Sequence, residues 1–289
     1  MDRVRKEVWR KRQAFRFRHL LRFERLFSRV WRRFPVGSYM LRMHFDAVER
    51  PHYAYGLYSA CLQARALEIP RISVYEFGVA GGNGLVALDK ASARIGGALG
   101  VDVDIVGFDL GSGLPEFVDY RDFPYWFLPG SYRQDEQAIR ERLPNARLVL
   151  GDVKDTVPQF LEDFDLGPIG FCVFDLDSYT GTLSALGLLR GDAATRLPRV
   201  LCYFDDLYNI SDLVMSCQRV GPLAAIAEFN AAGRSLSVEP IHLLGSTRVV
   251  QAEWNEAMYA CHDFDHPLYG RRVNPFTPEL ATQALALRK

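Results

Sequence analysis

Residues 74–84 read Val74-Tyr-Glu-Phe-Gly-Val-Ala-Gly-Gly-Asn-Gly84, and this stretch gives the clearest indication of the fold. An apolar run typical of a buried strand leads into a glycine-rich turn, and a helical pattern follows the turn. Glycines at such a turn allow a ligand to approach the backbone closely and to lie against the amino terminus of the helix. The stretch therefore predicts a strand, a ligand-binding turn and a helix, in that order.

The same alternation of strands and helices continues along the chain. Short apolar runs predict strands at residues 72–77, 104–109, 146–150, 170–175 and 199–204. Helical patterns lie between them, at residues 84–95, 135–143, 156–163 and 181–189. Strands that alternate with helices predict an α/β fold, in which a parallel sheet has helices on both faces. A long helix over 211–232 and a closing hairpin of 237–243 and 257–263 are expected after it.

Two helices are expected before the first strand. Residues 3–34 read as one amphipathic helix that ends at Pro35, and a second helix is expected over about 53–67. We therefore divide the chain into a basic helical segment, residues 1–69, and a sheet domain, residues 70–289.

Composition excludes several classes of protein. The chain of 289 residues is 48% hydrophobic and 24% charged, and its 35 basic and 35 acidic residues give no net charge. A strongly basic nucleic-acid-binding protein, a collagen and a charge-driven disordered chain are thereby disfavoured. The charges are unevenly placed, however: residues 2–34 hold 13 Lys and Arg against three acids, a net of +10, so the rest of the chain carries −10.

The basic segment has three conceivable partners. It could dock on the acidic body of its own or a second subunit, lie on an anionic membrane, or bind a polyanion. Its apolar stripe suits the first two, and no nucleic-acid-binding fold signature accompanies it. From sequence we expect a homo-oligomer formed through the amino-terminal helices, with membrane-surface contact less favoured and no nucleic acid.

The cysteines and the apolar runs bear on the compartment. The five cysteines are scattered without a CxxC pair, which indicates buried thiols rather than disulfides or a zinc site. No apolar run approaches the ~20 residues of a membrane span, and charges interrupt the amino terminus where a signal peptide has its apolar core. We expect a cytoplasmic protein.

The glycine-rich turn fits two cofactor classes. Residues 82–87 match the dinucleotide fingerprint GxGxxA, which alone is a weak signal. Glu76, however, ends the strand just before the glycines, where a carboxylate repels a pyrophosphate and pairs with an ammonium group. Asp109 ends the next strand and is placed to accept both ribose hydroxyls. These carboxylates favour S-adenosyl-L-methionine, a sulfonium that carries an ammonium group.

Five collinear motifs over about residues 70–210 carry a resemblance to a known family. They are Glu76-Phe-Gly-Val-Ala-Gly-Gly-Asn-Gly84, Phe108-Asp-Leu-Gly-Ser-Gly-Leu-Pro115, Gly151-Asp-Val-Lys-Asp-Thr-Val-Pro158, Phe174-Asp-Leu-Asp-Ser-Tyr179 and Tyr203-Phe-Asp-Asp-Leu207. With them the sequence resembles the class I S-adenosylmethionine-dependent methyltransferases and, among these, the macrocin O-methyltransferase family. The resemblance implies a Rossmann-like, seven-stranded methyltransferase sheet, here with an amino-terminal helical extension.

The resemblance also implies roles for individual residues. The methionine part of the cofactor would be held by Glu76, Gly78, Val79, Gly82, Asn83 and Gly84. Asp109 would hold the ribose, and Asp152 would lie beside the adenine, although an aspartate there also suits a helix cap. The implied metal ligands are Asp175, Asp205 and Asp206.

The acids after the fourth and fifth strands suggest how the chain would act. In the family's sheet these strands are neighbours, so Asp175 and Asp177 would meet Asp205 and Asp206 at one cleft. Carboxylates so close repel one another unless protons or a cation neutralise them, and all-oxygen ligands favour magnesium over zinc. The ion would lower the pKa of an acceptor hydroxyl, and Asp175 or Asp177 would take the proton. The alternative is that Asp205 and Asp206 only cap a loop.

Residues outside the five motifs are candidates for binding the acceptor or for acid–base chemistry. Residues 117–132 contain seven aromatic side chains, which suit either a pocket for a sugar, a phenol or a macrocycle or a cap packed on the core. His52 and His242 are further acid–base candidates, although lone histidines more often have structural roles. Arg196 and Arg199 are interpreted as solvated charges.

The function that follows is O-methylation of a hydroxyl on a small molecule or glycan, with S-adenosyl-L-methionine and magnesium. Three alternatives stay open at this point. An NAD-linked oxidoreductase would use residues 82–87 but leaves the aspartates unexplained. A hydroxylase-like relative on the same fold would keep the acids with a different redox partner, and a non-catalytic cofactor-binding protein would keep only the turn.

Overall fold

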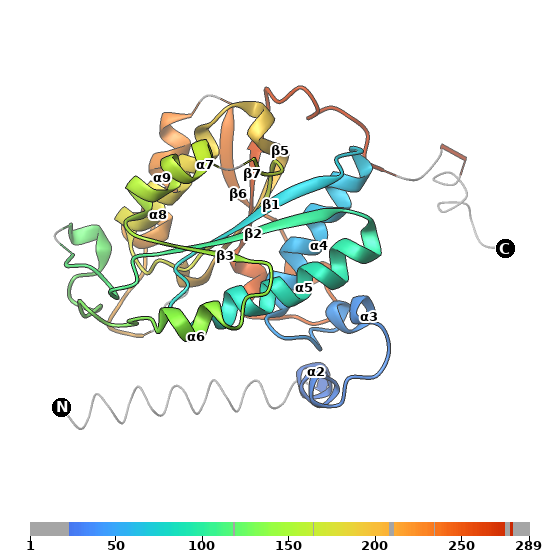
Figure 1. The fold of residues 1–289 in the computed structure, drawn as a ribbon, viewed down its shortest axis with the longest axis horizontal. Coiled ribbons are helices and arrows are strands. Elements are labelled where there is room, and N and C mark those ends of the chain that lie inside the picture. Colours follow the sequence, from blue (N-terminus) through green and yellow to red (C-terminus); the bar gives the residue numbers. More distant parts are fainter. Residues whose placement is uncertain are drawn as a thin grey trace.

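A seven-stranded sheet forms the centre of the computed structural model, which describes residues 23–117, 119–163, 165–207, 211–233, 235–274 and 278–279 (Figure 1). The strand order is β3-β2-β1-β4-β5-β7-β6. β1 to β5 run parallel, and β7 is antiparallel to both β5 and β6. The strands are β1 (Arg71–Phe77), β2 (Asp102–Asp109), β3 (Arg147–Leu150), β4 (Ile169–Phe174), β5 (Arg196–Phe204), β6 (Leu236–Pro240) and β7 (Met258–Asp263). The predicted Rossmann-like seven-stranded fold is confirmed.

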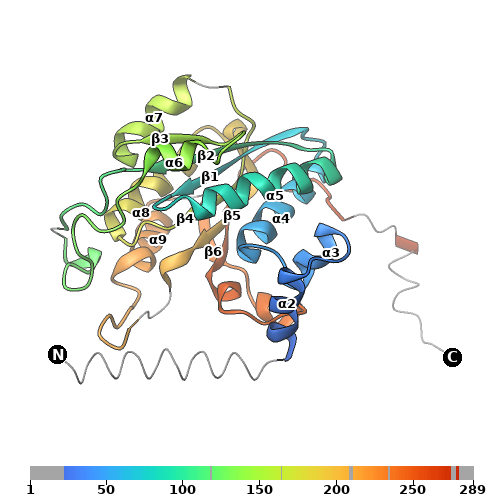
Figure 2. The ribbon, with the colours of Figure 1, turned by 60° about the horizontal axis from the view of Figure 1, so that its bottom comes forward.

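Helices cover both faces of the sheet. Those over the described residues are α2 (Phe23–Arg33), α3 (Tyr39–His44), α4 (Pro51–Ala66), α5 (Asn83–Leu99), α6 (Glu136–Arg140), α7 (Val153–Asp163), α8 (Tyr179–Leu186), α9 (Gly221–Ala232) and α10 (Leu244–Thr247). α4 and α5 lie on one face, and α7, α8 and α9 lie on the other (Figures 1 and 2). Each face has its own hydrophobic core, because alternate side chains of a strand point to opposite sides.

A row of phenylalanines crosses four neighbouring strands at their carboxyl ends. Phe108 of β2 pairs with Phe77 of β1, Phe77 with Phe174 of β4, and Phe174 with Phe204 of β5. The ring centroids of successive pairs lie 5.4, 5.4 and 4.6 Å apart, and the rings are stacked. Aromatic cross-strand pairs stabilise the register of a sheet. The residues that follow these four phenylalanines are therefore brought to one edge.

The helix α4 belongs to the same core as the sheet. Tyr53, Leu57 and Cys61 lie on its buried side, in the cluster that also contains Val74 of β1 and Phe171 of β4. The boundary predicted at residues 69/70 thus falls between elements of one hydrophobic core. Of the amphipathic helix predicted over 3–34, the described part is helical over Phe23–Arg33, and residues 3–22 lie outside the described residues.

The helix predicted over 211–232 is wrong in its first half. α9 begins only at Gly221, which has a φ of +60°, and Pro222 occupies its first turn. A proline is well tolerated there and disfavours continuation of a helix from before it, which is why the helix starts so late. The closing antiparallel pair is confirmed as β6 and β7, with α10 between them.

Arg196 was expected to be solvated, and this expectation is wrong. Its side chain is buried and forms a 2.6 Å ion pair with Asp263, which is also buried. The two strands β5 and β7 are paired over Arg199 to Tyr203, so they bring the two charges together near their ends. Arg199 lies over the ring of Tyr269 and donates to Gln63.

The buried thiols agree with the sequence. Cys61, Cys172, Cys202 and Cys261 are buried without disulfide partners, and Cys217 is exposed. Within the described ranges, none of the helices combines the length and the apolar character that a membrane crossing requires.

Candidate functional site at the carboxyl edge of the sheet

The glycine-rich turn joins β1 to α5 under tight steric limits. Gly78 has a φ of +87°, and a Cβ there would lie 1.7 Å from the carbonyl oxygen of Asp175. A Cβ on Gly84 would lie 1.9 Å from Oε1 of Glu76. Neither position therefore accepts a side chain. The first glycine allows β1 and β4 to end side by side, and the second makes room for a carboxylate under the first turn of α5.

Glu76 is a buried carboxylate with one oxygen unsatisfied. The side chain is 1% exposed; its Oε1 accepts a 2.7 Å hydrogen bond from the Tyr53 hydroxyl, whereas Oε2 has no hydrogen-bond partner among the described residues. Burial raises the pKa of Glu76, and the hydrogen bond from Tyr53 and the charge of Arg50 lower it. The effect of burial is the larger one, so the pKa is about 8. An orphaned buried carboxylate oxygen calls for a cationic hydrogen-bond donor.

Asp109 ties the glycine-rich turn to the end of β2. Its Oδ2 accepts from the backbone N–H groups of Val79 at 2.8 Å and Ala80 at 2.9 Å, and its Oδ1 accepts from Gly111 at 2.7 Å. A carboxylate has about four acceptor sites, so this bonding leaves room for one more donor. Asp109 therefore positions the turn, and its predicted contact with a ribose stays a prediction.

The other predicted cofactor residues take different positions around the turn. Val79 and Gly82 are buried, and Gly82 has a φ of +78° and caps α5, whereas Asn83 is exposed. Asp152 lies after β3, where its Oδ1 accepts from the backbone N–H of Lys154 at 2.9 Å. Asp152 thus serves as a helix cap, the alternative considered from sequence, and no contact of its side chain tests the adenine role.

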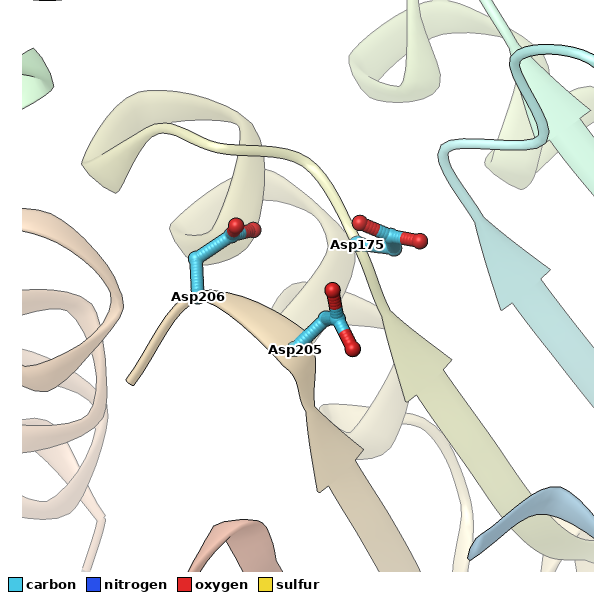
Figure 3. Close-up of side chains that lie close together, drawn as sticks. All are labelled: Asp175, Asp205 and Asp206. Carbon is cyan, nitrogen blue, oxygen red and sulfur yellow. The ribbon is translucent and has the colours of Figure 1, made fainter. Parts of the chain in front are cut away.

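Three carboxylates meet at the ends of β4 and β5 (Figure 3). Asp175 follows β4, and Asp205 and Asp206 follow β5. One carboxylate oxygen from each lies within 4.8 Å of the others. These are the three residues predicted as metal ligands, and the structure brings them together. Asp177, with a left-handed φ of 60°, joins the cluster through its backbone N–H, which donates to Oδ2 of Asp206 at 2.9 Å.

Burial and mutual repulsion raise the pKa values of this cluster. Burial is the larger cause for Asp175 and Asp206, whose pKa values lie well above the usual range, and the neighbouring carboxylates add to it. Burial, together with the charges of Asp175 and Asp205, raises the pKa of Asp177 to about 6. The cluster thus binds protons unless a cation takes their place, and carboxylate oxygens alone suit a hard divalent ion.

The sequence reading missed three residues that surround these acids. Arg50 precedes α4 with a φ of 41°, and its guanidinium lies 5.1 Å from the ring centroid of Tyr53. Burial opposes its charge, but Glu76, Asp175 and Asp205 favour it, and the pKa of Arg50 is raised. Tyr203 of β5 donates to Oδ1 of Asp205 at 2.7 Å. Nothing in the sequence around Pro51 indicated that Arg50 would lie beside the acids.

The two histidine candidates differ in position. His52 lies on the ring of Tyr203, with ring centroids 4.5 Å apart, and its Nε2 is buried without a hydrogen-bond partner among the described residues. Burial and the charge of Arg50 lower its pKa to about 3. His52 is therefore a neutral packing residue behind Asp205 at ordinary pH. His242 is exposed, and the described contacts do not bring it to the acids.

The aromatic segment 117–132 forms a small core with residues 211–220. Phe123, Phe127 and Val214 are buried together, and Tyr125 donates to the carbonyl of Val214 at 2.8 Å. Tyr132 lies on the side of the acids, since burial and then the charges of Asp177, Asp206 and Asp175 raise its pKa. The segment is thus a packed cap, as considered from sequence, and its alternative role as a pocket for the acceptor stays a prediction.

Asp122 anchors this segment to α8. It is buried, and it accepts from both the backbone N–H (2.7 Å) and the hydroxyl (2.8 Å) of Thr180. Asp122→Ala should lower the free energy of unfolding by about 2 kcal/mol, because two donors lose their acceptor, and should speed amide exchange in 119–127 more than in the sheet. Asp192→Ala, at an exposed cap, serves as the control. If Asp122→Ala sped amide exchange equally in residues 119–127 and in the sheet, the anchoring role would be contradicted.

A cavity of about 560 Å³ lies elsewhere, along the outer edge of β3. Its lining includes Arg140, Leu148 and Phe160, and none of the carboxylates described above. The convergence of buried charged groups, rather than this cavity, therefore identifies the carboxyl edge of β1, β4 and β5 as the candidate site.

No family model matches the chain, and no curated protein matches it in sequence. Similar solved structures include the calicheamicin methyltransferase CalS11 (22% identity, TM-score 0.45, 74% of this chain and 80% of that chain). Another is the O-methyltransferase NovP (18% identity, TM-score 0.46, 64% of this chain and 75% of that chain). A third is an O-methyltransferase from Bacillus cereus in complex with SAH (15% identity, TM-score 0.40, 74% of this chain and 80% of that chain). At these identities and TM-scores the likenesses concern the fold alone, and the narrower macrocin resemblance stays a prediction.

Proposed function

We propose that this chain is an S-adenosyl-L-methionine-dependent O-methyltransferase that uses a divalent cation, magnesium by preference, and acts on a hydroxyl of a small molecule or glycan. The observation that carries the proposal is the buried Glu76, whose Oε2 lacks a partner beneath the glycine-rich turn. It stands at the same edge of the sheet as the Asp175, Asp205 and Asp206 cluster. A site for a cationic cofactor beside a site for a metal ion supports methyl transfer to oxygen.

The residues of the turn fit the proposed cofactor. Glu76 would accept from the ammonium group of the methionine part, which would complete the bonding of its buried carboxylate. The backbone of residues 78–84 would lie along the same part, and Asp109 keeps acceptor capacity for a ribose hydroxyl. When bound, the cofactor supplies an electrophilic methyl group on its sulfonium. A dinucleotide fits less well, because Glu76 lies under the first turn of α5, where a pyrophosphate would bind.

The acid cluster fits a divalent ion. Asp175, Asp205 and Asp206 would hold it, and its charge would replace the protons that the raised pKa values otherwise demand. When bound, the ion supplies Lewis acidity that lowers the pKa of an acceptor hydroxyl. Tyr203 fixes the carboxylate of Asp205 by donating to Oδ1, and Asp206 is fixed by the backbone of Asp177.

Asp177 is the base in this proposal. It lies outside the ligand set and is bonded through its backbone to Asp206. Because it lies beside the three proposed ligands without being one of them, its carboxylate would be available to take the proton that the acceptor hydroxyl loses. The acceptor itself would approach from the side of Tyr132, and the aromatic segment would keep water from the reacting groups.

Titration calorimetry with S-adenosylhomocysteine and with NAD tests the cofactor class. We expect S-adenosylhomocysteine to bind and NAD to give no heat, because the carboxylate at Glu76 favours an ammonium over a pyrophosphate. Asp152→Ala, a change at the cap of α7, tests whether the adenine lies there. Binding of NAD without S-adenosylhomocysteine would overturn the proposal in favour of an oxidoreductase. Binding of S-adenosylhomocysteine without turnover on any hydroxyl acceptor would favour a non-catalytic binding protein.

A further inference from the structure

The helix α2 contacts the body of the protein through a side that combines polar and aromatic residues. Ser28 is buried, and its hydroxyl donates to the carbonyl of Phe45. Arg25 donates to the carbonyl of Gln251 at 2.8 Å and pairs with Glu253 at 3.3 Å. An amphipathic helix on a globular protein normally turns its apolar stripe inward. In α2 the rings of Phe27 and Trp31 do so, with centroids 6.4 and 5.5 Å from that of Phe45. Leu26, Val30 and Phe34 take no part in this contact and are exposed.

The apolar stripe of α2 is directed outward. Leu26, Val30 and Phe34 follow one another at four-residue spacing, and they are 42%, 53% and 66% exposed. Residues four apart lie on one side of a helix, so the three form a continuous stripe. Val36, just beyond the helix, and Leu41, in α3, are also exposed. Scattered exposed apolar residues are ordinary, but a stripe of them on one helix marks an interaction surface.

Positive charge borders this stripe. Arg29 and Arg33 are exposed. Arg29 lies three residues after Leu26, and Arg33 lies three residues after Val30, so both arginines lie beside the stripe. In residues 2–34 as a whole, the net charge is +10. If α2 of a second copy covered the stripe, arginines would face arginines at low dielectric, which is unfavourable. An anionic bilayer surface offers apolar chains and negative charge together.

We infer that α2 docks on an anionic lipid surface, with Leu26, Val30 and Phe34 entering the interface and Arg29 and Arg33 meeting the headgroups. A second copy of the chain was the partner favoured by the sequence alone. The outward stripe and its flanking arginines favour the lipid surface. This inference concerns a face of the molecule that the proposed methyltransferase site does not use, and it stands or fails independently of that site.

Co-sedimentation of the full chain with vesicles tests the inference. The wild type should sediment with phosphatidylcholine vesicles that contain about one third phosphatidylserine, and stay in solution with phosphatidylcholine alone. Val30→Ser combined with Phe34→Ser should lower the vesicle-bound to free ratio about tenfold or more, because two apolar side chains no longer enter the interface. The matched control is Phe264→Ser, an exposed ring after β7 at the opposite edge of the sheet, which should bind as the wild type does.

A second variant keeps the test decisive if the serine variant does not fold. Arg29→Gln with Arg33→Gln should also weaken binding, and raising the salt from about 0.1 M to about 1 M should have the same effect by screening. Equal binding to both kinds of vesicle would overturn the inference. So would a wild-type dimer by light scattering that Val30→Ser/Phe34→Ser converts to a monomer, since a second copy then covers the stripe. A third outcome would also overturn it: the arginine variant loses vesicle binding, the serine variant keeps it, and the wild type binds single-stranded nucleic acid tightly. That result would indicate a polyanion partner instead.

Discussion

Asp205→Ala combined with Asp206→Ala should reduce methyl-transfer turnover about 10³-fold, while binding of S-adenosylhomocysteine stays within about threefold of the wild type. The two carboxylates follow β5 and converge with Asp175, so their loss leaves one of the three acids that would hold the divalent ion. Glu76 and the glycine-rich turn, which would hold the cofactor, are not changed. The expected result is thus a loss of turnover without a loss of cofactor affinity.

The measurements for this variant are a labelled-methyl assay with and without added magnesium and a calorimetric titration. Asp102→Ala is the control, because Asp102 is an exposed acid at the amino-terminal edge of the same sheet. Turnover that stays metal-dependent at the wild-type rate would contradict the metal site. The cluster is also a source of repulsion, so the double variant without metal should be at least as resistant to heat as the wild type.

Glu76→Gln should weaken S-adenosylhomocysteine binding about 100-fold and stabilise the ligand-free protein at alkaline pH. The affinity falls because the amide cannot form a charge-assisted bond with an ammonium group. The stability rises because burial, with Oε2 unpaired, disfavours the ionised carboxylate of Glu76 in the folded state. A pKa raised from 4.5 to about 8 destabilises the folded protein by an amount on the order of 5 kcal/mol at high pH.

The sign of the pH dependence follows from this raised pKa. Between the unfolded value of 4.5 and the folded value of about 8, the folded protein holds the Glu76 proton and the unfolded chain does not. Stability therefore falls as pH rises through this window and is highest at its lower end. The groups that act on Glu76 are Tyr53, Arg50, Asp109 and Asp205, of which the last two oppose its charge.

Thermal unfolding at about pH 6 and about pH 8.5 measures this effect. The wild type should lose several degrees of Tm between the two, and Glu76→Gln should lose less. Glu141→Gln, an exposed change directly after α6, should reproduce the wild-type difference. A glutamine variant with the same pH dependence as the wild type would show that Glu76 is not the responsible group.

The strands of the sheet were predictable because parallel strands buried on both faces appear as continuous apolar runs. The five predicted runs each lie within three residues of β1 to β5 at both ends. The same runs end in acids, so the convergence of Asp175, Asp205 and Asp206 also followed from sequence once the strand order was known. The contact of Glu76 with the start of α5 was indicated only by the absence of a side chain at Gly84.

Features that depend on distant packing were not predictable. Arg50, just before α4, and Tyr53, in its first turn, precede the recognisable motifs, and no charge pattern there is directed at them. Arg196 was misread because nothing near it in sequence indicates Asp263, the partner that makes its burial tolerable. The stretch 211–220 has helical composition, but its partner is the aromatic segment 117–132, and that packing overrides local propensity.

The row of phenylalanines has a consequence for how this sheet tolerates change. Each of Phe108, Phe174 and Phe204 is followed directly by an aspartate, so a strand that slipped by one residue would carry an acid into the aromatic layer and a ring into the site. A sheet with a shifted strand register is therefore much less stable than the native sheet. The register that aligns the phenylalanines also places the acids at the sheet edge. The segments 111–134 and 211–220 lie outside the strands and are free of this constraint. Under the proposed function, a change of acceptor would therefore fall on these segments, while the residues at the sheet edge stay in place.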